Sequence, residues 1–375
     1  MSSLVWVELD SKAPEHNLRQ LRAGAAPGVI SCAVVKGNGY GHGAVQMASL
    51  LPSAEWFGVN SLDEALELRT HGVSRPIVVL GHVPLDELPA AVEADLGLTV
   101  YNRETIERLS SLPTLPRPAR LHVKVDSGTH RQGVFPEDLE RFLSLIKGNP
   151  RVVLEGISTH YANIEDTLNH EYAEMQIARF NEALAIVDRV VGRPPFIHTA
   201  CTAATILFSS THFTMLRSGI GLYGLWPSKE TLVAAREKDS KLDFRPVMTW
   251  KTRLVQIKTV AEGSYVGYGC SYRTTRKTLM GVLPIGYSDG YDRALGNRGH
   301  VLVRGRRAQI LGRICMNLCM VDLTDISGVH LEEEVVLLGK SGDEQISAET
   351  MADWAGTINY EVVTRISPLL PRKVV

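Results

Sequence analysis

The segment Ile30-Ser-Cys-Ala-Val-Val-Lys36-Gly-Asn-Gly-Tyr40-Gly-His-Gly43 places a lysine between an apolar run and a glycine-rich run. A charged lysine at the end of a buried strand is costly unless its charge is used. The glycines allow sharp turns and a close approach of backbone N–H groups to a ligand. A desolvated lysine can become the neutral amine that condenses with a carbonyl. Two interpretations of Lys36 follow: covalent attachment of pyridoxal phosphate (PLP) as a Schiff base, or a side chain that reaches into water.

Apolar runs similar to the one before Lys36 recur along the first 220 residues. Eight such runs, with helical patterns between most of them, predict a parallel sheet. About 230 residues is close to the size of a (β/α)8 barrel, which we favour over an open doubly wound sheet. The eight predicted strands are Ile30–Val35, Trp56–Val59, Ile77–Gly81, Leu96–Tyr101, Leu121–Val125, Leu154–Thr159, Phe196–Ala200 and Leu216–Ile220.

Polar and charged residues follow several of these strands. In a barrel the carboxyl ends of the strands carry the functional site, and convergence of such groups marks a site more strongly than any one of them does. The residues concerned are Lys36, Lys124, Asp126, Arg131, His160, His198 and Arg217.

The pattern changes after Trp226-Pro227, where helical periodicity fades and strand-like runs separated by Gly and Asn turns begin. We therefore predict an α/β fold with two domains. A TIM-like (β/α)8 barrel would span residues 10–235 and carry the cofactor, and a mostly-β domain would span 236–375. The early strand at 1–9 precedes the barrel pattern and would join the second domain. The strand-like runs there are Met248–Val260, Leu279–Ile285, Gln309–Leu311, Leu318–Asp322 and Glu333–Leu338.

The composition is that of an ordinary globular enzyme. Apolar residues make up 44% of the 375 residues and charged residues 22%, and the net charge of -1 does not indicate a nucleic-acid or anionic-membrane partner. The sequence has no apolar run long enough for a membrane span and no signal-peptide pattern at its start, so we expect a cytoplasmic protein with reduced cysteines. Cys315 and Cys319 have no matching second Cys or His pair, so we expect no metal site.

The glycine run after Lys36 is a poor match to the dinucleotide-binding fingerprint, because its spacing is not G-x-G-x-x-G. The segment Leu216-Arg-Ser-Gly-Ile-Gly-Leu-Tyr-Gly224 is a better candidate for binding a small phosphate. Barrels commonly bind phosphate with the loops after strands seven and eight. Thr202 could add a hydroxyl there and Ser218–Ile220 could add backbone N–H donors, although a glycine-rich turn that merely closes the barrel is also possible.

Nine motifs, in order along both predicted domains, make the chain resemble the alanine racemases, PLP enzymes of fold type III. They are Val-Val-Lys36-Gly-Asn-Gly-Tyr40-Gly-His-Gly, Lys124-Val-Asp-Ser-Gly-Thr-His-Arg131, Ser-Thr-His160-Tyr-Ala, His198-Thr-Ala-Cys-Thr202, Leu-Arg217-Ser-Gly219-Ile220, Val-Gly-Tyr268-Gly, Ile-Gly-Tyr287-Ser-Asp-Gly, Gly-Arg-Ile-Cys-Met316-Asn and Thr-Ile-Asn-Tyr360-Glu.

The resemblance implies a homodimer that interconverts L- and D-alanine, with sites shared between subunits. Lys36 would hold PLP and act as one acid/base, and Tyr268 from the partner subunit would act as the second. Lys124 resembles a lysine that is often carbamylated to brace Arg131. The other implied cofactor ligands are Tyr40, His160, Thr202, Arg217, Ser218, Gly219, Ile220 and Tyr360. The implied substrate-binding residues are Arg131, Met316 of the partner subunit and Tyr287. The pathway implied is the supply of D-alanine for bacterial peptidoglycan.

The chain departs from the family pattern at Gly37, Gly39, Cys201, Ser218 and Asn317. These changes leave open a racemase of broad specificity or one that prefers serine. A fold-type-III decarboxylase is a further alternative, but we find no substrate-binding motifs for it in the second domain. A non-catalytic PLP-binding barrel would lack the second domain altogether.

Overall fold

The computed structural model describes residues 3–165, 167–238 and 241–375. The chain forms two compact units. The first comprises Pro14–Gly39 and Met47–Arg245, and the second comprises Met1–Ala13, Tyr40–Gln46 and Pro246–Val375.

The first unit contains eight parallel strands in the order β8-β7-β6-β5-β4-β3-β2-β9. Backbone hydrogen bonds from Thr214 to Ile197 (3.2 Å) and from Arg217 to Ala200 (2.9 Å) bring the two ends of this order together, so the barrel is nearly closed. The predicted barrel and its eight strands are confirmed. Their bounds are β2 (Ile30–Val34), β3 (Trp56–Val59), β4 (Ile77–Val79), β5 (Leu96–Val100), β6 (Ala119–Lys124), β7 (Val152–Ser158), β8 (Phe196–His198) and β9 (Met215–Ser218).

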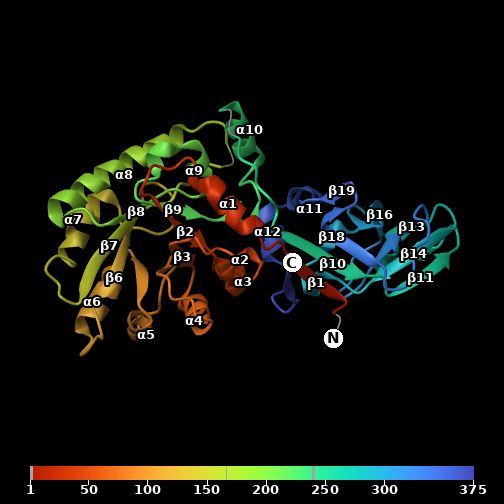
Figure 1. The fold of residues 1–375 in the computed structure, drawn as a ribbon, viewed down its shortest axis with the longest axis horizontal. Coiled ribbons are helices and arrows are strands. Elements are labelled where there is room, and N and C mark those ends of the chain that lie inside the picture. Colours follow the sequence, from red (N-terminus) through yellow and green to blue (C-terminus); the bar gives the residue numbers. More distant parts are fainter. Residues whose placement is uncertain (1–2, 166, 239–240) are drawn as a thin grey trace. The chain divides into compact units, whose positions relative to one another are not determined.

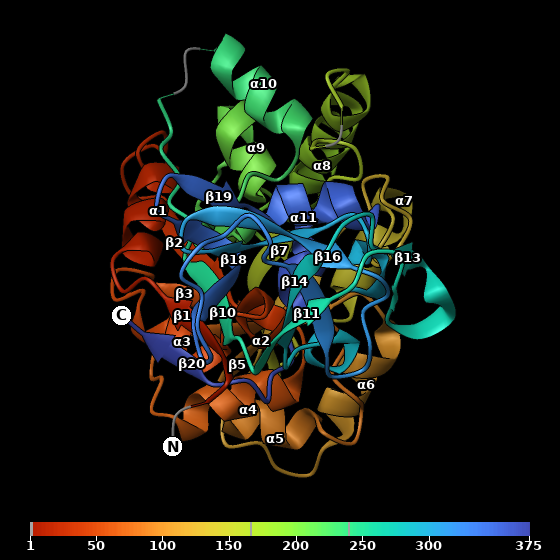
Figure 2. The same cartoon turned by 90° about the vertical axis from the view of Figure 1, so that its right-hand side faces the viewer.

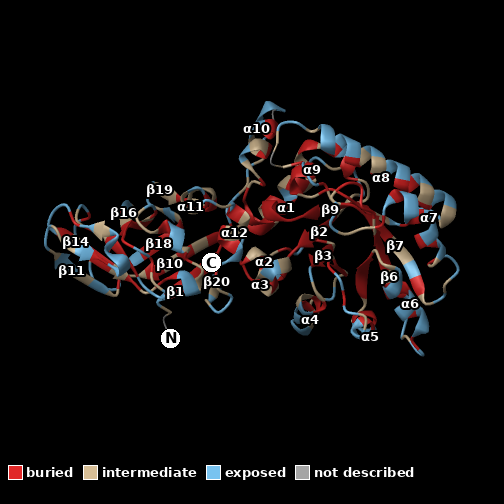
Figure 3. Ribbon diagram, turned by 180° about the vertical axis from the view of Figure 1, so that it is seen from behind, coloured by how far each residue is buried: buried red, intermediate tan, exposed pale blue. Residues whose placement is uncertain are grey.

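Helices flank the strands on the outside of the barrel (Figure 1), and Figure 3 shows buried strands beneath helices whose outer faces are exposed. Polar side chains cap the N-termini of several of these helices. The Ser61 hydroxyl accepts from the Glu64 amide, and the Asn102 side chain accepts from the Thr105 amide. The helices up to residue 245 are α1 (Ala13–Arg22), α3 (Ala44–Ser49), α4 (Leu62–Thr70), α5 (Leu88–Glu93), α6 (Arg103–Ser111), α7 (Pro136–Ser144), α8 (Glu171–Val190), α9 (Thr202–Leu207) and α10 (Lys229–Glu237), with 3-10 turns η1 (Ser209–Thr211) and η2 (Ile220–Tyr223).

The segment after Lys36, α2 (Lys36–Tyr40), is a left-handed turn. Gly37, Asn38, Gly39 and Tyr40 have φ angles of 62°, 52°, 59° and 50°. Residues with a Cβ atom pay a steric cost in this region, and glycine does not. The two glycines that depart from the family pattern therefore occupy positions where glycine relieves backbone strain.

Gly37→Ala should lower the free energy of unfolding by about 1–2 kcal/mol, because a Cβ atom is disfavoured at positive φ. Urea unfolding followed by circular dichroism measures this change. Gly24→Ala is the matched control, since a Cβ atom at Gly24 meets no atom within 4 Å. Equal stability of the two variants would contradict the strain argument.

The second unit is built on a mostly antiparallel sheet with the order β11-β14-β17-β16-β15-β18-β10-β1-β20, and β19 pairs with β18. Strands β10, β11, β14, β16 and β18 are labelled in Figure 2. β1 pairs antiparallel with β10 and parallel with β20. The bounds are β1 (Val5–Leu9), β10 (Met248–Arg253), β11 (Gln256–Val260), β12 (Tyr265–Val266), β13 (Tyr272–Arg273), β14 (Thr278–Leu283), β15 (His300–Val303), β16 (Arg306–Leu311), β17 (Cys319–Asp322), β18 (Glu334–Ser341), β19 (Glu344–Ile346) and β20 (Arg372–Val374).

The predicted strand-like run Met248–Val260 contains two strands. Leu254 donates its amide to Glu333 next to β18, whereas Val255 donates to Val282 of β14, so the chain changes partner between them. Two helices that the sequence analysis did not predict, α11 (Ala348–Ala355) and α12 (Asn359–Thr364), lie near the end of the chain. The 3-10 turns of this unit are η3 (Tyr268–Cys270), η4 (Tyr287–Asp289) and η5 (Arg293–Leu295).

Within the described part of the chain, no helix combines the length and apolar character that crossing a membrane requires.

Candidate active site

Five of the predicted residues lie at the carboxyl ends of barrel strands. Lys36 comes two residues after β2, Lys124 ends β6, and His160 comes two residues after β7. His198 ends β8, and Arg217 is the third residue of β9. Because the strands are parallel, these ends meet at one rim of the barrel.

Arg217 is buried, and its guanidinium is fixed by several acceptors. One amino group, Nη1, donates to His198 Nδ1 (2.8 Å) and to the His198 carbonyl. The other, Nη2, donates to the carbonyls of Thr159 (2.7 Å) and Thr199 (3.1 Å). Burial lowers the pKa of Arg217, and the groups that partly oppose this shift are Cys201, Cys32 and Tyr161 rather than carboxylates. Arg217 is thus a rigid hydrogen-bond donor that does not give up its proton, unlike a carboxylic acid.

Basic groups cluster around Arg217, and the pKa values of three of them, Lys36, Lys124 and His160, are lowered. Burial, followed by Arg131, lowers the pKa of Lys36. Burial and the nearby Arg217, Arg131 and Lys36 lower the pKa of Lys124 to about 8. Burial and the same cations lower the pKa of His160 to about 3. A lysine desolvated beside other cations is the usual form of an amine nucleophile, and the cluster as a whole favours an anionic ligand.

Thr202 and the β9–η2 loop form the predicted phosphate cradle. The buried Thr202 hydroxyl accepts from the amides of Gly219 (3.2 Å) and Gly221 (3.3 Å). A Cβ atom at Gly221 would come within 2.7 Å of Thr202 Cγ2, so glycine keeps this approach open. The buried Ser218 hydroxyl has no partner within the described chain. A phosphate fits this arrangement, because its oxygens could accept from the hydroxyls of Thr202 and Ser218.

Arg131 is exposed in the loop after β6. Asp126 shapes this loop by accepting from the amides of Gly128 and His130, both at 3.0 Å. Lys124 Nζ donates to Gln132 Oε1 (3.3 Å), and Gln132 in turn donates to the Tyr101 hydroxyl (2.9 Å). The structure therefore links Lys124 to Gln132, a residue that the sequence analysis did not single out.

The remaining predicted residues belong to the second unit. The rings of Tyr40 and Tyr360 lie 6.2 Å apart. Tyr287 and Met316 lie in adjoining turns, since the Met316 carbonyl accepts from the Ser288 amide (3.1 Å) and hydroxyl (2.9 Å). Tyr268 begins η3 and is 73% exposed.

Comparison with known proteins identifies the family of the chain. Residues 9–227 match the family "Alanine racemase, N-terminal domain", and residues 247–374 match "Alanine racemase, C-terminal domain". The chain belongs to the alanine racemase family. The family resemblance inferred from the motifs is confirmed, as is the expectation of an enzyme.

Relatives and solved structures of the family match over nearly the whole chain. The alanine racemase of Leptospira interrogans (serovar copenhageni, strain Fiocruz L1-130) is 40% identical over 99% of this chain and 95% of its own. A crystal structure of alanine racemase from Bacillus anthracis, described with bound L-Ala-P, has a TM-score of 0.93 and 35% identity, covering 100% of this chain and 96% of that one. The alanine racemase structure from E. faecalis has a TM-score of 0.91 and 33% identity, covering 99% and 98%.

Proposed function

We propose that this alanine racemase family member is a PLP-dependent enzyme that interconverts L-alanine and D-alanine with two bases. One observation carries the proposal: a desolvated lysine, Lys36, stands among cations at the same barrel rim as the Thr202–Gly221 cradle. An amine of this kind suits covalent attachment of PLP, and the cradle suits its phosphate.

PLP, when bound, supplies the electron sink that stabilises negative charge at the substrate Cα. Lys36 would hold the cofactor, and Thr202, Ser218, Gly219 and Ile220 would bind its phosphate, together with Tyr40 and Tyr360 as predicted from the sequence. Arg217 would donate to the ring nitrogen without giving up a proton. His160 stays neutral because its pKa is lowered to about 3, so it adds no further charge beside the ring.

Racemisation removes the α-proton on one face and returns one on the other, so two groups must flank the substrate. Lys36 serves one face. We assign the other to Tyr268 of the partner subunit, in a homodimer whose sites are shared. The exposed apolar side chains of the second unit, Tyr265, Tyr268, Met316 and Leu318, support an assembly that covers them.

Arg131 and the backbone of the partner subunit's Met316 would receive the substrate carboxylate, and Tyr287 would be a further substrate-binding residue. The Lys124 amine has a pKa of about 8, so a part of it is neutral near pH 8. A neutral amine attacks CO2 to form a carbamate and releases a proton. The resulting anion would offset the charges of Arg131 and Arg217, which now act unfavourably on Lys124.

In ¹³C-bicarbonate at pH 8, the protein should show a carbamate carbon resonance that Lys124→Ala lacks. Solid-state or high-field solution ¹³C NMR measures it. Lys147→Ala, at an exposed lysine of the barrel, should keep the resonance. A wild-type spectrum without a carbamate signal would count against the modification.

The proposed activity is tested by incubating the enzyme and PLP with single enantiomers of alanine, serine and larger amino acids, followed by chiral chromatography. We expect the fastest interconversion with alanine. A faster reaction with serine would support the serine-preferring alternative, and CO2 release without interconversion would support a decarboxylase. No epimerisation of any substrate would refute the proposal.

A further inference from the structure

A continuous chain of hydrogen-bonded side chains runs through the barrel interior to Arg217. Glu155 on β7 bonds through Oε2 to His122 Nε2 (3.0 Å) on β6. His122 Nδ1 bonds to His198 Nε2 (2.9 Å) on β8, and His198 Nδ1 bonds to Arg217 Nη1 (2.8 Å) on β9. Both histidines are completely buried.

The two ends of this chain fix the direction of every hydrogen bond in it. Arg217 can only donate, so His198 Nδ1 must accept and its proton must sit on Nε2. His198 Nε2–H then donates to His122 Nδ1, which leaves the proton of His122 on Nε2, facing Glu155. A carboxylate can only accept, so the far end agrees with the near end. Burial and Arg217 also lower the pKa of His198 well below its usual range, in keeping with a neutral ring.

The barrel strands leave space for the side chain of His122. A Cβ atom at Gly156 of β7 would come within 2.2 Å of His122 Nδ1, and one at Gly97 of β5 within 2.9 Å of Nε2. Neither glycine has a positive φ angle, so each is needed for space rather than for backbone freedom. Trp56 and Phe196 enclose the same ring, at centroid distances of 5.6 and 6.3 Å. The neighbouring strands thus hold the imidazole in one orientation.

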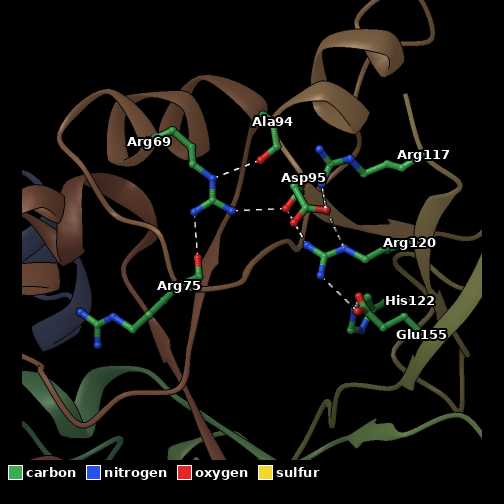
Figure 4. Close-up of polar contacts among 8 residues, drawn as sticks. All are labelled: Arg69, Arg75, Ala94, Asp95, Arg117, Arg120, His122 and Glu155. Atoms are coloured by element: carbon green, nitrogen blue, oxygen red, sulfur yellow. Dashed lines mark hydrogen bonds and ion pairs between the residues drawn. The ribbon is translucent and has the colours of Figure 1, made fainter. Parts of the chain in front are cut away.

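Among the residues that the structure describes, Glu155 is the only charged acceptor in this series of hydrogen bonds. It is not part of a simple buried ion pair, because its arginine partner has a second carboxylate partner. Arg120 reaches its other oxygen (3.3 Å) and also contacts Asp95 (3.4 Å), as Figure 4 shows. Asp95 is paired in addition with Arg117 (3.1 Å). Arg120 is therefore shared between two carboxylates, which leaves negative charge on Glu155 for His122.

We propose that Glu155 is a positioning residue that acts on Arg217 through His122 and His198. Its carboxylate fixes the tautomers of both rings, and the oriented dipoles partly offset the guanidinium charge from the side opposite the predicted ligand. Hydrogen bonds in such a chain polarise one another in the low-dielectric interior. Arg217 is thereby kept rigid and its donor strength is moderated. The consequence for catalysis rests on the proposed function, in which Arg217 faces the PLP ring nitrogen.

The first test does not depend on catalysis. In the full-length protein with ¹⁵N-labelled histidine, side-chain NMR should show His122 and His198 as neutral Nε2–H tautomers. Glu155→Gln should shift the His122 Nε2–H proton upfield, because a neutral acceptor forms a weaker bond than a carboxylate. Asp95→Asn makes the same charge change on the same arginine without touching the hydrogen-bonded chain, and should shift the His122 Nε2–H proton by much less than Glu155→Gln does. Equal shifts in the two variants, or a charged or Nδ1–H ring in the wild type, would overturn the proposal.

Arg120→Gln gives a test of opposite sign, which also serves if Glu155→Gln fails to fold. Freed from its arginine, Glu155 becomes a stronger acceptor, so the His122 Nε2–H proton should move downfield. No shift, or an upfield shift, would contradict the proposed role.

The second test measures racemisation. Glu155→Gln should lower kcat about 10-fold with little change in KM. Residues that hydrogen-bond to metal ligands affect activity by about 10- to 100-fold, and we expect the low end of that range here. Asp95→Asn should stay within about twofold of the wild type. A wild-type enzyme without racemase activity would refute the proposed function and leave the NMR test standing. An active enzyme with an unaffected Glu155→Gln variant would refute the inference alone.

Discussion

Lys36→Ala should abolish covalent attachment of PLP and lower racemisation by about 10⁴-fold, since it removes both the cofactor anchor and one of the two bases. The Lys36 amine is desolvated and stands near Arg131 and Arg217, which lowers its pKa and raises its neutral fraction at neutral pH. Borohydride reduction followed by intact-mass measurement detects the attached cofactor, and chiral chromatography measures the reaction.

Lys36→Arg is the matched variant, because it keeps the positive charge and cannot condense with the cofactor aldehyde. It should lose the mass increase as well, whereas Lys147→Ala at an exposed site should retain it. Covalent PLP on the Lys36→Ala protein, or racemisation within tenfold of the wild type, would assign the anchor to another lysine, with Lys124 the nearest candidate in the cluster.

The barrel was predictable because its parallel strands are buried on both faces. Such strands appear in the sequence as continuous apolar runs, as in Trp56–Val59 and Leu96–Val100, where every residue is buried. The polar residues that end these strands were visible for the same reason. A charged or imidazole side chain stands out directly after an apolar run, as Lys36 and His160 do.

Other features depend on contacts that a linear pattern does not carry. His122 and Glu155 lie within strands, where a polar residue can equally face solvent, and only the three-dimensional structure shows that they meet. The spacing of His122 and Lys124 was the one available signal, since residues two apart on a strand share a face. The helices α11 and α12 are 8 and 6 residues long, too short for a clear helical period. The change of partner at Leu254–Val255 is hidden because strand-like residues continue without a turn signal from β10 through Leu254-Val255 into β11.

Tyr268→Phe should lower racemisation by about 10³-fold while covalent PLP attachment is retained, because it removes only the second base. With Lys36 intact, one enantiomer of alanine should still exchange its α-proton with solvent. Mass spectrometry of alanine incubated in D2O, with each enantiomer separately, measures this exchange. Tyr265→Phe is the control, since Tyr265 is a similarly exposed tyrosine three residues away. Loss of exchange for both enantiomers, or unchanged racemisation, would contradict the two-base assignment.

The same variants decide whether the site is shared between subunits. When Lys36→Ala and Tyr268→Phe protomers are mixed and allowed to exchange, about half of the dimers become hybrids, and in a shared-site C2 dimer each hybrid holds one intact site. Activity should then return to about one quarter of the wild-type value, although each variant alone is inactive. If Tyr268 served the Lys36 of its own chain, both sites of every hybrid would be defective and mixing would restore nothing. The exposed tyrosine of the second unit would then act within one chain, and the homodimer would no longer be required for catalysis.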